Sequence, residues 1–377
     1  MGIEIVEQTA NSSNRPRIRP QRGQKVATRK RKALDDLYVG IDLGTARSAV
    51  TTSSGAAAWD RSLVGWPKDV IARKLLKKDV VYGAECLDHR LALDVFRPLQ
   101  DGVVHKNTER DEEAIRALAQ HLISLVDAED GQRVQAVIGA PAEASSYNKG
   151  LLREAFGELV DASMVVSEPF TVAYGLDMLV DALVVDIGAG TIDLCIMRGT
   201  VPTAEDQRTI EQAGDYIDRQ LADLLHERFP NAQFTDSMVV KWKEAHAFVG
   251  DDPGQKVKVT IPVDGKPTAH DITDEMRTAC ESILPHLLGE IRELIAAFDP
   301  ELQEQVRQNV LLAGGGSQIR GIDRAIEEML AELGGGKVKA VEDALFAGAK
   351  GALEIAKDTP DEDWARLAKE GPTPPSR

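Results

Sequence analysis

The sequence is poor in the residues that build disulfide frameworks and metal centres. Only three of its 377 residues are cysteines, and they are scattered at Cys86, Cys195 and Cys280. None has the paired spacing of a disulfide framework or a zinc site. The seven histidines show no ligand spacing either. We therefore expect neither kind of site, and instead a reduced, cytoplasmic protein.

Long apolar runs are missing as well. No segment has the roughly 20 uncharged apolar residues of a membrane-spanning helix, and the first residues are polar and unlike a signal peptide. With 43% hydrophobic and 28% charged residues, the composition is that of a soluble globular protein. The chain is also long enough to form two domains.

Charge is distributed unevenly along the chain. The whole chain carries a net charge of −16, whereas its first 36 residues hold nine Lys or Arg and only four Asp or Glu. This arm has few large apolar residues and is predicted to be disordered. It is either a solvated leader or an electrostatic arm for an acidic protein, nucleic acid or anionic membrane. Because it has no apolar face, direct insertion into a bilayer is not expected.

Residues 183–197, LVVDIGAGTIDLCIM, combine an apolar run with a glycine turn. The run ends on Asp186, and the turn that follows consists of Gly188, Ala189, Gly190 and Thr191. Residues 191–197 are rich in β-formers and include a second acid, so the pattern predicts a strand, a tight turn and another strand. A dinucleotide fingerprint or a Walker loop needs a helix directly after the glycines. The missing helix and the absence of Lys in the turn exclude both of these phosphate loops.

The same pattern occurs earlier in the chain, in residues 38–50. A run with Tyr38, Val39 and Ile41 precedes Asp42, and the turn consists of Gly44, Thr45 and Ala46. A single Asp-x-Gly turn is common in ordinary structural hairpins. Two matched copies favour a functional interpretation, in which two similar domains face each other across a cleft.

Two such hairpins can form a site for a nucleoside triphosphate. Backbone N–H groups in a glycine turn point into one concavity and can hold phosphate oxygens. The hydroxyls of Thr45 and Thr191 can add donors. Asp42 and Asp186 would repel phosphates unless a cation stood between them, so the pattern predicts ATP or ADP together with Mg²⁺, which binds few protein carboxylates and keeps most of its waters.

A third glycine-rich element lies in residues 309–321. A buried strand is expected to lead into a shelf formed by Gly314, Gly315, Gly316 and Ser317, and an amphipathic helix over residues 322–330 follows. The glycines leave a flat floor for a base and ribose, and the helix start offers N–H groups to an α-phosphate. A flexible loop is the alternative, but the strand before and the helix after favour function.

Two Asp-Gly hairpins followed by a strand, three glycines and a helix resemble the actin, Hsp70 and hexokinase superfamily. Within it, four segments resemble the MreB-related bacterial actins: RPLQDGVV (97–104), IGAPA (138–142), VSEPF (166–170) and AGDYID (213–218). Further segments resemble the magnetosome-organising members of that group: VGWPKDVI (64–71), VVSEPF (165–170) and GTVP (199–202). The resemblance extends from about residue 37 to about residue 366 and leaves out the basic arm.

The resemblance implies an α/β actin-like ATPase fold with two related domains flanking a nucleotide cleft. Domain I would span residues 37–170, completed by a C-terminal helix over residues 343–357, and domain II would span residues 171–342. The small residues of that helix would let it cross the helix over residues 167–176 closely, as the hinge of this family does. Residues 1–36 would be the disordered arm, and residues 358–377 are expected to be a frayed tail.

The resemblance also implies roles for individual residues. Glu168 would be catalytic and orient the hydrolytic water, a position where the alternative is an ordinary acid at a helix start. Asp186 would be catalytic too, and with Asp42 would hold Mg²⁺ through its waters. Lys243 and Glu244 would line the adenosine pocket, and Gly214 and Asp215 would contact the ribose; alternatively, these four form a solvated helix face and a helix-entry turn.

The function implied is that of a polymerising ATPase. Subunits that add head to tail without closing a ring form an open filament, and the resemblance implies a cytoplasmic filament that positions magnetosomes and turns over by ATP hydrolysis. Its partners would be further copies of itself and an acidic linker protein on the magnetosome surface; no nucleic acid is expected.

Two alternatives remain. One is an MreB-type cell-shape filament attached to the membrane, for which the polar arm lacks an apolar face. The other is a non-polymerising ATPase of the superfamily. A sugar kinase would need a separate base beside the phosphates, and a chaperone would need a substrate-binding domain after the GGG helix; neither is visible in the sequence.

Overall fold

The computed structural model describes residues 35–104, 108–126, 128–251 and 256–370. These residues belong to one compact unit. The predicted disordered arm lies outside the described residues, apart from Asp35 and Asp36. Within the described ranges, no helix is both long enough and apolar enough to cross a membrane.

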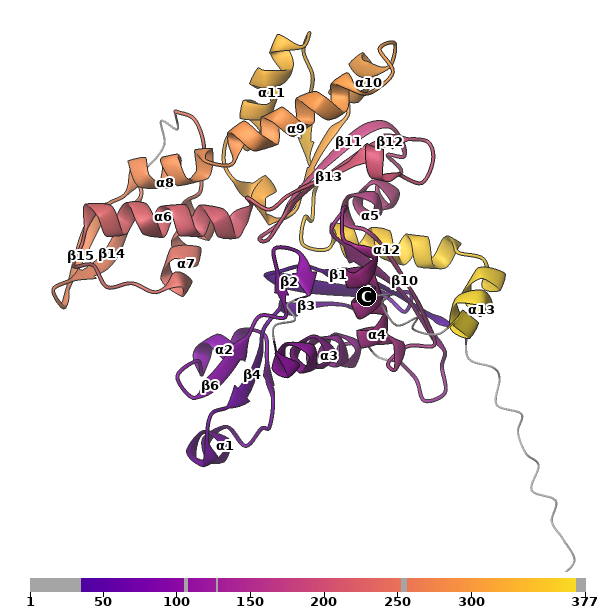
Figure 1. Cartoon of the computed structure of the whole chain (residues 1–377), viewed down its shortest axis with the longest axis horizontal. Helices are drawn as coiled ribbons and strands as arrows, with labels where there is room; N and C mark the ends of the chain where they lie inside the picture. Colours follow the sequence, from indigo (N-terminus) through magenta and orange to yellow (C-terminus); the bar gives the residue numbers. More distant parts are fainter. Residues whose placement is uncertain (1–34, 105–107, 127, 252–255, 371–377) are drawn as a thin grey trace, which may run out of the picture. The chain divides into compact units, whose positions relative to one another are not determined.

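The first sheet has five strands in the order β10-β9-β1-β2-β3 (Figure 1). Their bounds are β1 Leu37–Leu43, β2 Arg47–Thr52, β3 Ala57–Arg61, β9 Val134–Ala140 and β10 Ala162–Ser167. β1 and β2 form the predicted antiparallel hairpin, whereas β9 and β10 run parallel to β1. α3 (Glu109–Ser124) and α4 (Ser146–Gly157) pack on one face, and α12 (Ala347–Asp358) packs on β1 and β9. All seven residues of β9 are buried, as is typical of a central strand covered on both sides.

The second sheet also has five strands, in the order β13-β12-β11-β16-β17. Their bounds are β11 Val180–Ile187, β12 Ile192–Arg198, β13 Gln207–Ile210, β16 Val310–Ala313 and β17 Val338–Ala340. β11 and β12 form the second predicted hairpin, and β16 runs parallel to β11. The largest apolar core lies between this sheet and the helices α6 (Gly214–Arg228), α8 (Thr273–Glu281), α9 (Leu284–Ala296) and α11 (Ile322–Glu332). The other face of the sheet is covered by α5 (Glu168–Gly175).

Helices α5 and α12 cross between the two sheets, as the small residues of α12 predict (Figure 1). A Cβ atom on Gly351 would lie only 1.7 Å from the carbonyl oxygen of Thr171, so the two backbones touch. One boundary was predicted wrongly, because α12 begins at Ala347 and not at residue 343. Asp343 has a φ of 37°, and Phe346 N donates to its carbonyl oxygen, so the residues before Ala347 form a turn.

The expectation of a frayed tail from residue 358 is wrong for the part that the structure describes. Helix α13 (Asp361–Glu370) follows α12 directly. Trp364 is 1% exposed, packs with residues of α12 and the first sheet, and donates its Nε1–H to the carbonyl oxygen of Ala356 at 3.2 Å. Burial of this large side chain stabilises α13, although the composition of residues 358–377 alone predicts no helix.

Smaller elements lie at the periphery of the two sheets. Those of the first half are β4 Val64–Pro67, α1 Val70–Leu76, β5 Val81–Tyr82, α2 Ala84–Asp88, β6 Leu93–Phe96, β7 Leu99–Gln100 and β8 Val103–Val104. Those of the second half are α7 Asp236–His246, β14 Lys258–Val263, β15 Lys266–Asp271 and α10 Gln303–Gln308, with 3₁₀ turns at η1 Ala204–Asp206 and η2 Gly315–Gln318. The predicted strand–GGG–helix element is present as β16 and α11, but the glycine shelf itself is wound into η2.

Candidate functional site

The two predicted glycine turns lie against each other. A Cβ atom on Gly190 would lie 2.5 Å from Thr45 Oγ1 and 2.9 Å from Gly102 N, so only glycine allows this approach. Gly102 N donates to Thr45 Oγ1 at 3.2 Å. Gly188 N donates to the carbonyl oxygen of Thr191 at 2.8 Å and closes the second turn. The turns of two separate sheets therefore form one continuous backbone surface.

Three predicted carboxylates gather beside these turns. Asp42 lies near the end of β1, Asp186 near the end of β11, and Glu168 at the first position of α5. Burial raises the pKa of Asp42 from 3.8 to about 6. Burial and the charge of Asp42 raise the pKa of Asp186 well above its usual value, and burial and the same charge do so for Glu168. Acids that raise one another's pKa in this way lie close together in a poorly solvated place.

A fourth acid, Asp193, belongs to this cluster and carries no role in the sequence prediction. It is 1% exposed and pairs with Asp186 across the β11–β12 hairpin. Its charge contributes to the raised pKa of both Glu168 and Asp186. The signal was present in the sequence as the second acid of the segment 183–197, since residues opposite each other in a hairpin share a face of the sheet.

The glycine shelf adjoins the same cluster. Gly314 has a φ of 71°, and a Cβ atom there would lie 2.3 Å from Asp186 Oδ1. Ser317 is buried, and its hydroxyl donates to the carbonyl oxygen of Gly314 at 2.7 Å. Gly315 is exposed, with open space where a side chain would be, and Gly316 packs on Ile187. The shelf therefore extends outward from Asp186.

The residues predicted for ribose and adenosine lie at the start of α6 and on α7. Asp215 N donates to the carbonyl oxygen of Ala189 at 2.7 Å, which joins α6 to the second glycine turn. Lys243 Nζ donates to the carbonyl oxygen of Gly214 and to Asp218 Oδ2, both at 2.6 Å. The structure thus brings Gly214, Asp215 and Lys243 together beside that turn.

Two ion pairs join α6 and α7 to residues of the first half of the chain: Arg47 on β2, and Arg97 just after β6. Arg47 pairs with Glu244 at 2.5 Å, and Arg97 pairs with Asp215 at 2.7 Å. Arg97 Nε also donates to the carbonyl oxygen of Thr45 at 3.0 Å. Ala46, in the first glycine turn, is held by a backbone hydrogen bond, because its carbonyl oxygen accepts the N–H of Ser62. The pairs of Glu244 and Asp215 could not be predicted from the sequence, since each partner lies more than a hundred residues away.

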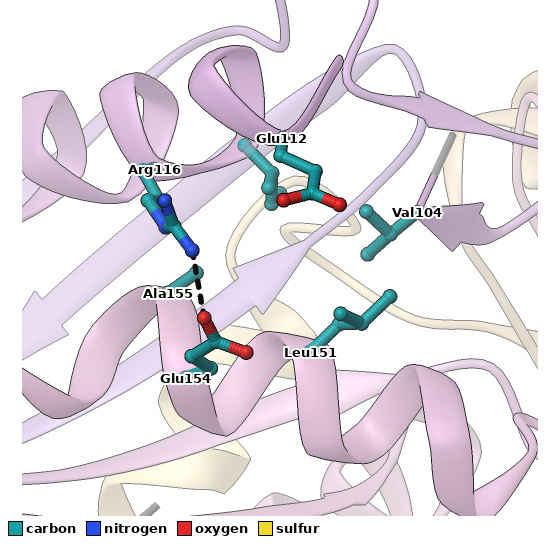
Figure 2. Close-up of a pocket in the computed structure, with 7 residues that line it drawn as sticks. Val104, Glu112, Arg116, Leu151, Glu154 and Ala155 are labelled. Atoms are coloured by element: carbon teal, nitrogen blue, oxygen red, sulfur yellow. Dashed lines mark hydrogen bonds and ion pairs between the residues drawn. The ribbon is translucent and has the colours of Figure 1, made fainter. Parts of the chain in front are cut away.

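A small hollow lies elsewhere, between α3 and α4 (Figure 2). Figure 2 shows Arg116 and Glu154 pointing toward each other across it, and their side chains pair at 2.7 Å. Val104, Ile115 and Leu151 supply its apolar lining. None of the predicted site residues lines this hollow, so it is not part of the candidate site.

The donor set fits a hard divalent cation that is held mainly by a ligand and water. The cluster offers carboxylate oxygens, which Mg²⁺ prefers, and burial raises the pKa of Asp42, Glu168 and Asp186, with neighbouring acids adding to the rise for Glu168 and Asp186. Among the described residues, no group of three or more His, Cys, Asp or Glu side chains is arranged to hold a metal alone. A cation here would need further oxygens, such as those of phosphates.

Comparison with known proteins identifies the family. The family model described as MreB/Mbl protein matches residues 36–363. The actin-like protein MamK of Paramagnetospirillum magneticum is 42% identical over 336 residues, which are 89% of this chain and 96% of the relative.

Solved structures of similar sequence share the fold. A MamK double helical filament has a TM-score of 0.84 at 42% identity and covers 86% of this chain and 100% of its own. A non-polymerising MamK mutant bound to AMPPNP has a TM-score of 0.67 at 42% identity and covers 86% of this chain and 99% of its own. The predicted α/β actin-like fold is thereby confirmed, and the chain belongs to the MreB/Mbl family of actin-like proteins.

Proposed function

We propose that this protein is an actin-like ATPase that polymerises into cytoplasmic filaments, and that these filaments organise and position magnetosome chains. The observation that carries the proposal is the meeting of two Asp-Gly hairpins beside Glu168, in a chain 42% identical to a MamK whose structure is a filament. Hydrolysis of ATP would drive filament turnover. The bound AMPPNP of a related MamK structure supports a nucleoside triphosphate as the ligand.

The nucleotide roles follow from the contacts of the site. The glycine turns at residues 44–46 and 188–191 would bind the β- and γ-phosphates through backbone N–H groups and threonine hydroxyls. The shelf at residues 314–317 would support the base and ribose. Lys243, held between Gly214 and Asp218, would form the adenosine wall with Glu244, while Asp215 would lie beside the ribose.

Mg²⁺ would supply the positive charge that the phosphates and carboxylates need to share one site. Asp42 and Asp186 would hold it through its waters. Glu168 would then be ionised and accept a hydrogen bond, or a proton at a carboxylate oxygen, from the water that attacks the γ-phosphate. Asp186 would keep that region oriented from the opposite hairpin.

The division into domains forms part of this proposal. Residues 37–170 with the C-terminal helix would be domain I, and residues 171–342 would be domain II, with the α5–α12 crossing between them as the hinge. Nucleotide bound by both glycine turns would favour one arrangement of the domains. Further copies of the chain would add head to tail, and an acidic protein on the magnetosome surface would link the filament to its cargo.

Sedimentation across a concentration series tests the proposal. The purified protein is incubated with Mg-ATP, with Mg-ADP or without nucleotide, beside Glu168→Ala and the exposed-acid control Glu158→Ala. We expect pelleting above a critical concentration with Mg-ATP. Glu168→Ala should pellet while releasing at least about 10-fold less phosphate, the scale of effect that general-base removal has. Phosphate release by the wild type without pelleting at any concentration would refute the filament claim alone.

A further inference from the structure

The two hairpins differ in the residue that stands opposite the leading aspartate. In the first hairpin, Asp42 pairs across the strands with Ala49; in the second, Asp186 pairs with Asp193. Both partners stand seven residues after the leading aspartate. Asp193 is therefore an additional acid without a counterpart, and it is nevertheless almost completely buried. Buried charges are retained where hydrogen bonds compensate them.

Asp193 accepts hydrogen bonds from the loop after β9 and from the second sheet. Its Oδ1 accepts the N–H of Ala142, which follows β9 of the first sheet, at 2.7 Å. It also accepts the hydroxyl of Thr209, on β13 of the second sheet, at 2.6 Å. The neighbouring Thr191 side chain also lowers the pKa of this carboxyl group, which burial raises. One side chain thus holds the loop after β9 against the second sheet.

Thr209 extends this contact by one residue. Its hydroxyl oxygen accepts the N–H of Glu143 at 3.0 Å, and its own N–H donates to Glu143 Oε2 at 3.0 Å. Two successive N–H groups of one loop, at Ala142 and Glu143, are therefore bound by two neighbouring side chains of the second sheet. We name the four residues Ala142, Glu143, Asp193 and Thr209 the clasp.

The clasp lies close to the residue that the proposed hydrolysis depends on. Strand β9 pairs in parallel with β10, and Ala140 stands opposite Ser167, the residue before Glu168. Glu168 leans on Gly139, where a Cβ atom would lie 3.2 Å from its Cγ. A shift of the loop after β9 would move the surface against which the Glu168 side chain rests.

We propose that Asp193 and Thr209 are positioning residues. They fasten the loop after β9 to the second sheet and thereby align Glu168 with the water that attacks the γ-phosphate. This inference rests on the proposed ATPase function. Both residues act through the loop and not on the reacting atoms. Hydrogen bonds from N–H groups to a carboxylate are among the strong ones, which suits a contact that must persist while nucleotide binds.

The chain offers matched variants for the test. Thr209→Val removes the hydroxyl at nearly constant volume, whereas Thr209→Ser keeps it. Asp193→Ala removes the acceptor, whereas Asp193→Asn keeps an oxygen that can accept from Ala142 N and Thr209 Oγ1. Thr268→Val, on the exposed strand β15, is the control for the same change away from the clasp, because that hydroxyl donates to the neighbouring Lys266 O.

Phosphate release at saturating Mg-ATP, ATP affinity, and hydrogen exchange of the peptide containing residues 142–143 are then measured on the full chain. We expect kcat to fall about 10-fold or more in Asp193→Ala and several-fold in Thr209→Val, the scale of a small misplacement at a reacting centre. Thr209→Ser and Thr268→Val should stay within about threefold of wild type, and Asp193→Asn should lose less than Asp193→Ala. Thr209→Val should bind ATP with unchanged affinity and exchange faster at residues 142–143 than Thr209→Ser.

The outcomes separate the inference from the proposed function. Wild-type kcat in Thr209→Val overturns the inference, and so does a loss that appears only as weaker ATP binding. If Asp193→Ala fails to fold, the Thr209 pair decides by itself. If the wild type releases no phosphate, the proposed function fails, and the positioning role fails with it; if the wild type is active and the clasp variants are equally active, only the inference fails.

Discussion

The crossing of α5 and α12 allows a sharp prediction, because the same substitution should have opposite signs at two helical glycines. On α12, a Cβ atom at Gly351 would lie 1.7 Å from Thr171 O and 2.5 Å from Thr171 C. On α9, a Cβ atom at Gly289 would meet nothing within 4 Å. Gly351→Ala should therefore destabilise the protein, and Gly289→Ala should stabilise it.

The magnitudes follow from the contacts. A carbon and an oxygen at ordinary contact are separated by about 3.3 Å, so α5 would have to retreat by roughly 1.5 Å. The obstacle at Gly351 is backbone and cannot rotate away, which places the cost near the upper end of overpacking, about 3 kcal/mol. The higher helix propensity of alanine relative to glycine offsets about 1 kcal/mol of this loss. The net loss is about 2 kcal/mol, against a gain of about 0.5–1 kcal/mol at Gly289.

Urea unfolding of the nucleotide-free protein, followed by far-UV circular dichroism below the concentration at which it pellets, measures both effects. Because α5 begins at Glu168, Gly351→Ala should also lower phosphate release, whereas Gly289→Ala should not. Equal midpoints for the two variants would refute the close crossing, since the two substitutions differ only in what surrounds the new methyl group.

Three further predictions follow from the site and the C-terminus. Burial raises the pKa of Asp42 from 3.8 to about 6, so between these pH values the folded chain holds a proton that the unfolded chain has lost. The free energy of unfolding without nucleotide should therefore fall by on the order of 3 kcal/mol from pH 4 to pH 7. Asp42→Asn should lose this part of the pH dependence in urea titrations. Removal of Mg²⁺ with EDTA should weaken ATP binding at least about 10-fold in a fluorescence titration, because the phosphates would then face the carboxylates directly. Equal affinity with and without EDTA would rule out a role for the metal in ATP binding. Trp364→Ala should lower the free energy of unfolding in urea by about 3–5 kcal/mol. Arg366→Ala, on the exposed side of α13, should lower it by less than about 1 kcal/mol. Similar losses for the two variants would mean that α13 does not pack against the rest of the protein.

The parts of the fold that the sequence predicted are those that local pattern determines. Asp-x-Gly between two β-rich runs is a short-range signal, and both hairpins form where it occurs. The small residues of α12 likewise predicted a close crossing, because a helix without side-chain bulk can touch another backbone.

The parts that were missed depend on distant residues. Trp364 is buried by α12 and the first sheet, so the composition of its own segment indicated only a tail. Asp193 has its partners at Ala142 and Thr209, which lie 51 and 16 residues away. The pairing of Arg47 with Glu244 spans 197 residues. Contacts of this kind arise from the arrangement of the two sheets and have no signal in the local sequence.

Light scattering and phosphate release, recorded together in one sample after addition of Mg-ATP, test the central claim most directly. Scattering should rise first, phosphate release should follow, and scattering should fall once the ATP is consumed. In Glu168→Ala, scattering should rise and stay high. Phosphate release with no rise in scattering at any protein concentration, or scattering that rises equally without nucleotide, would contradict an ATP-driven filament.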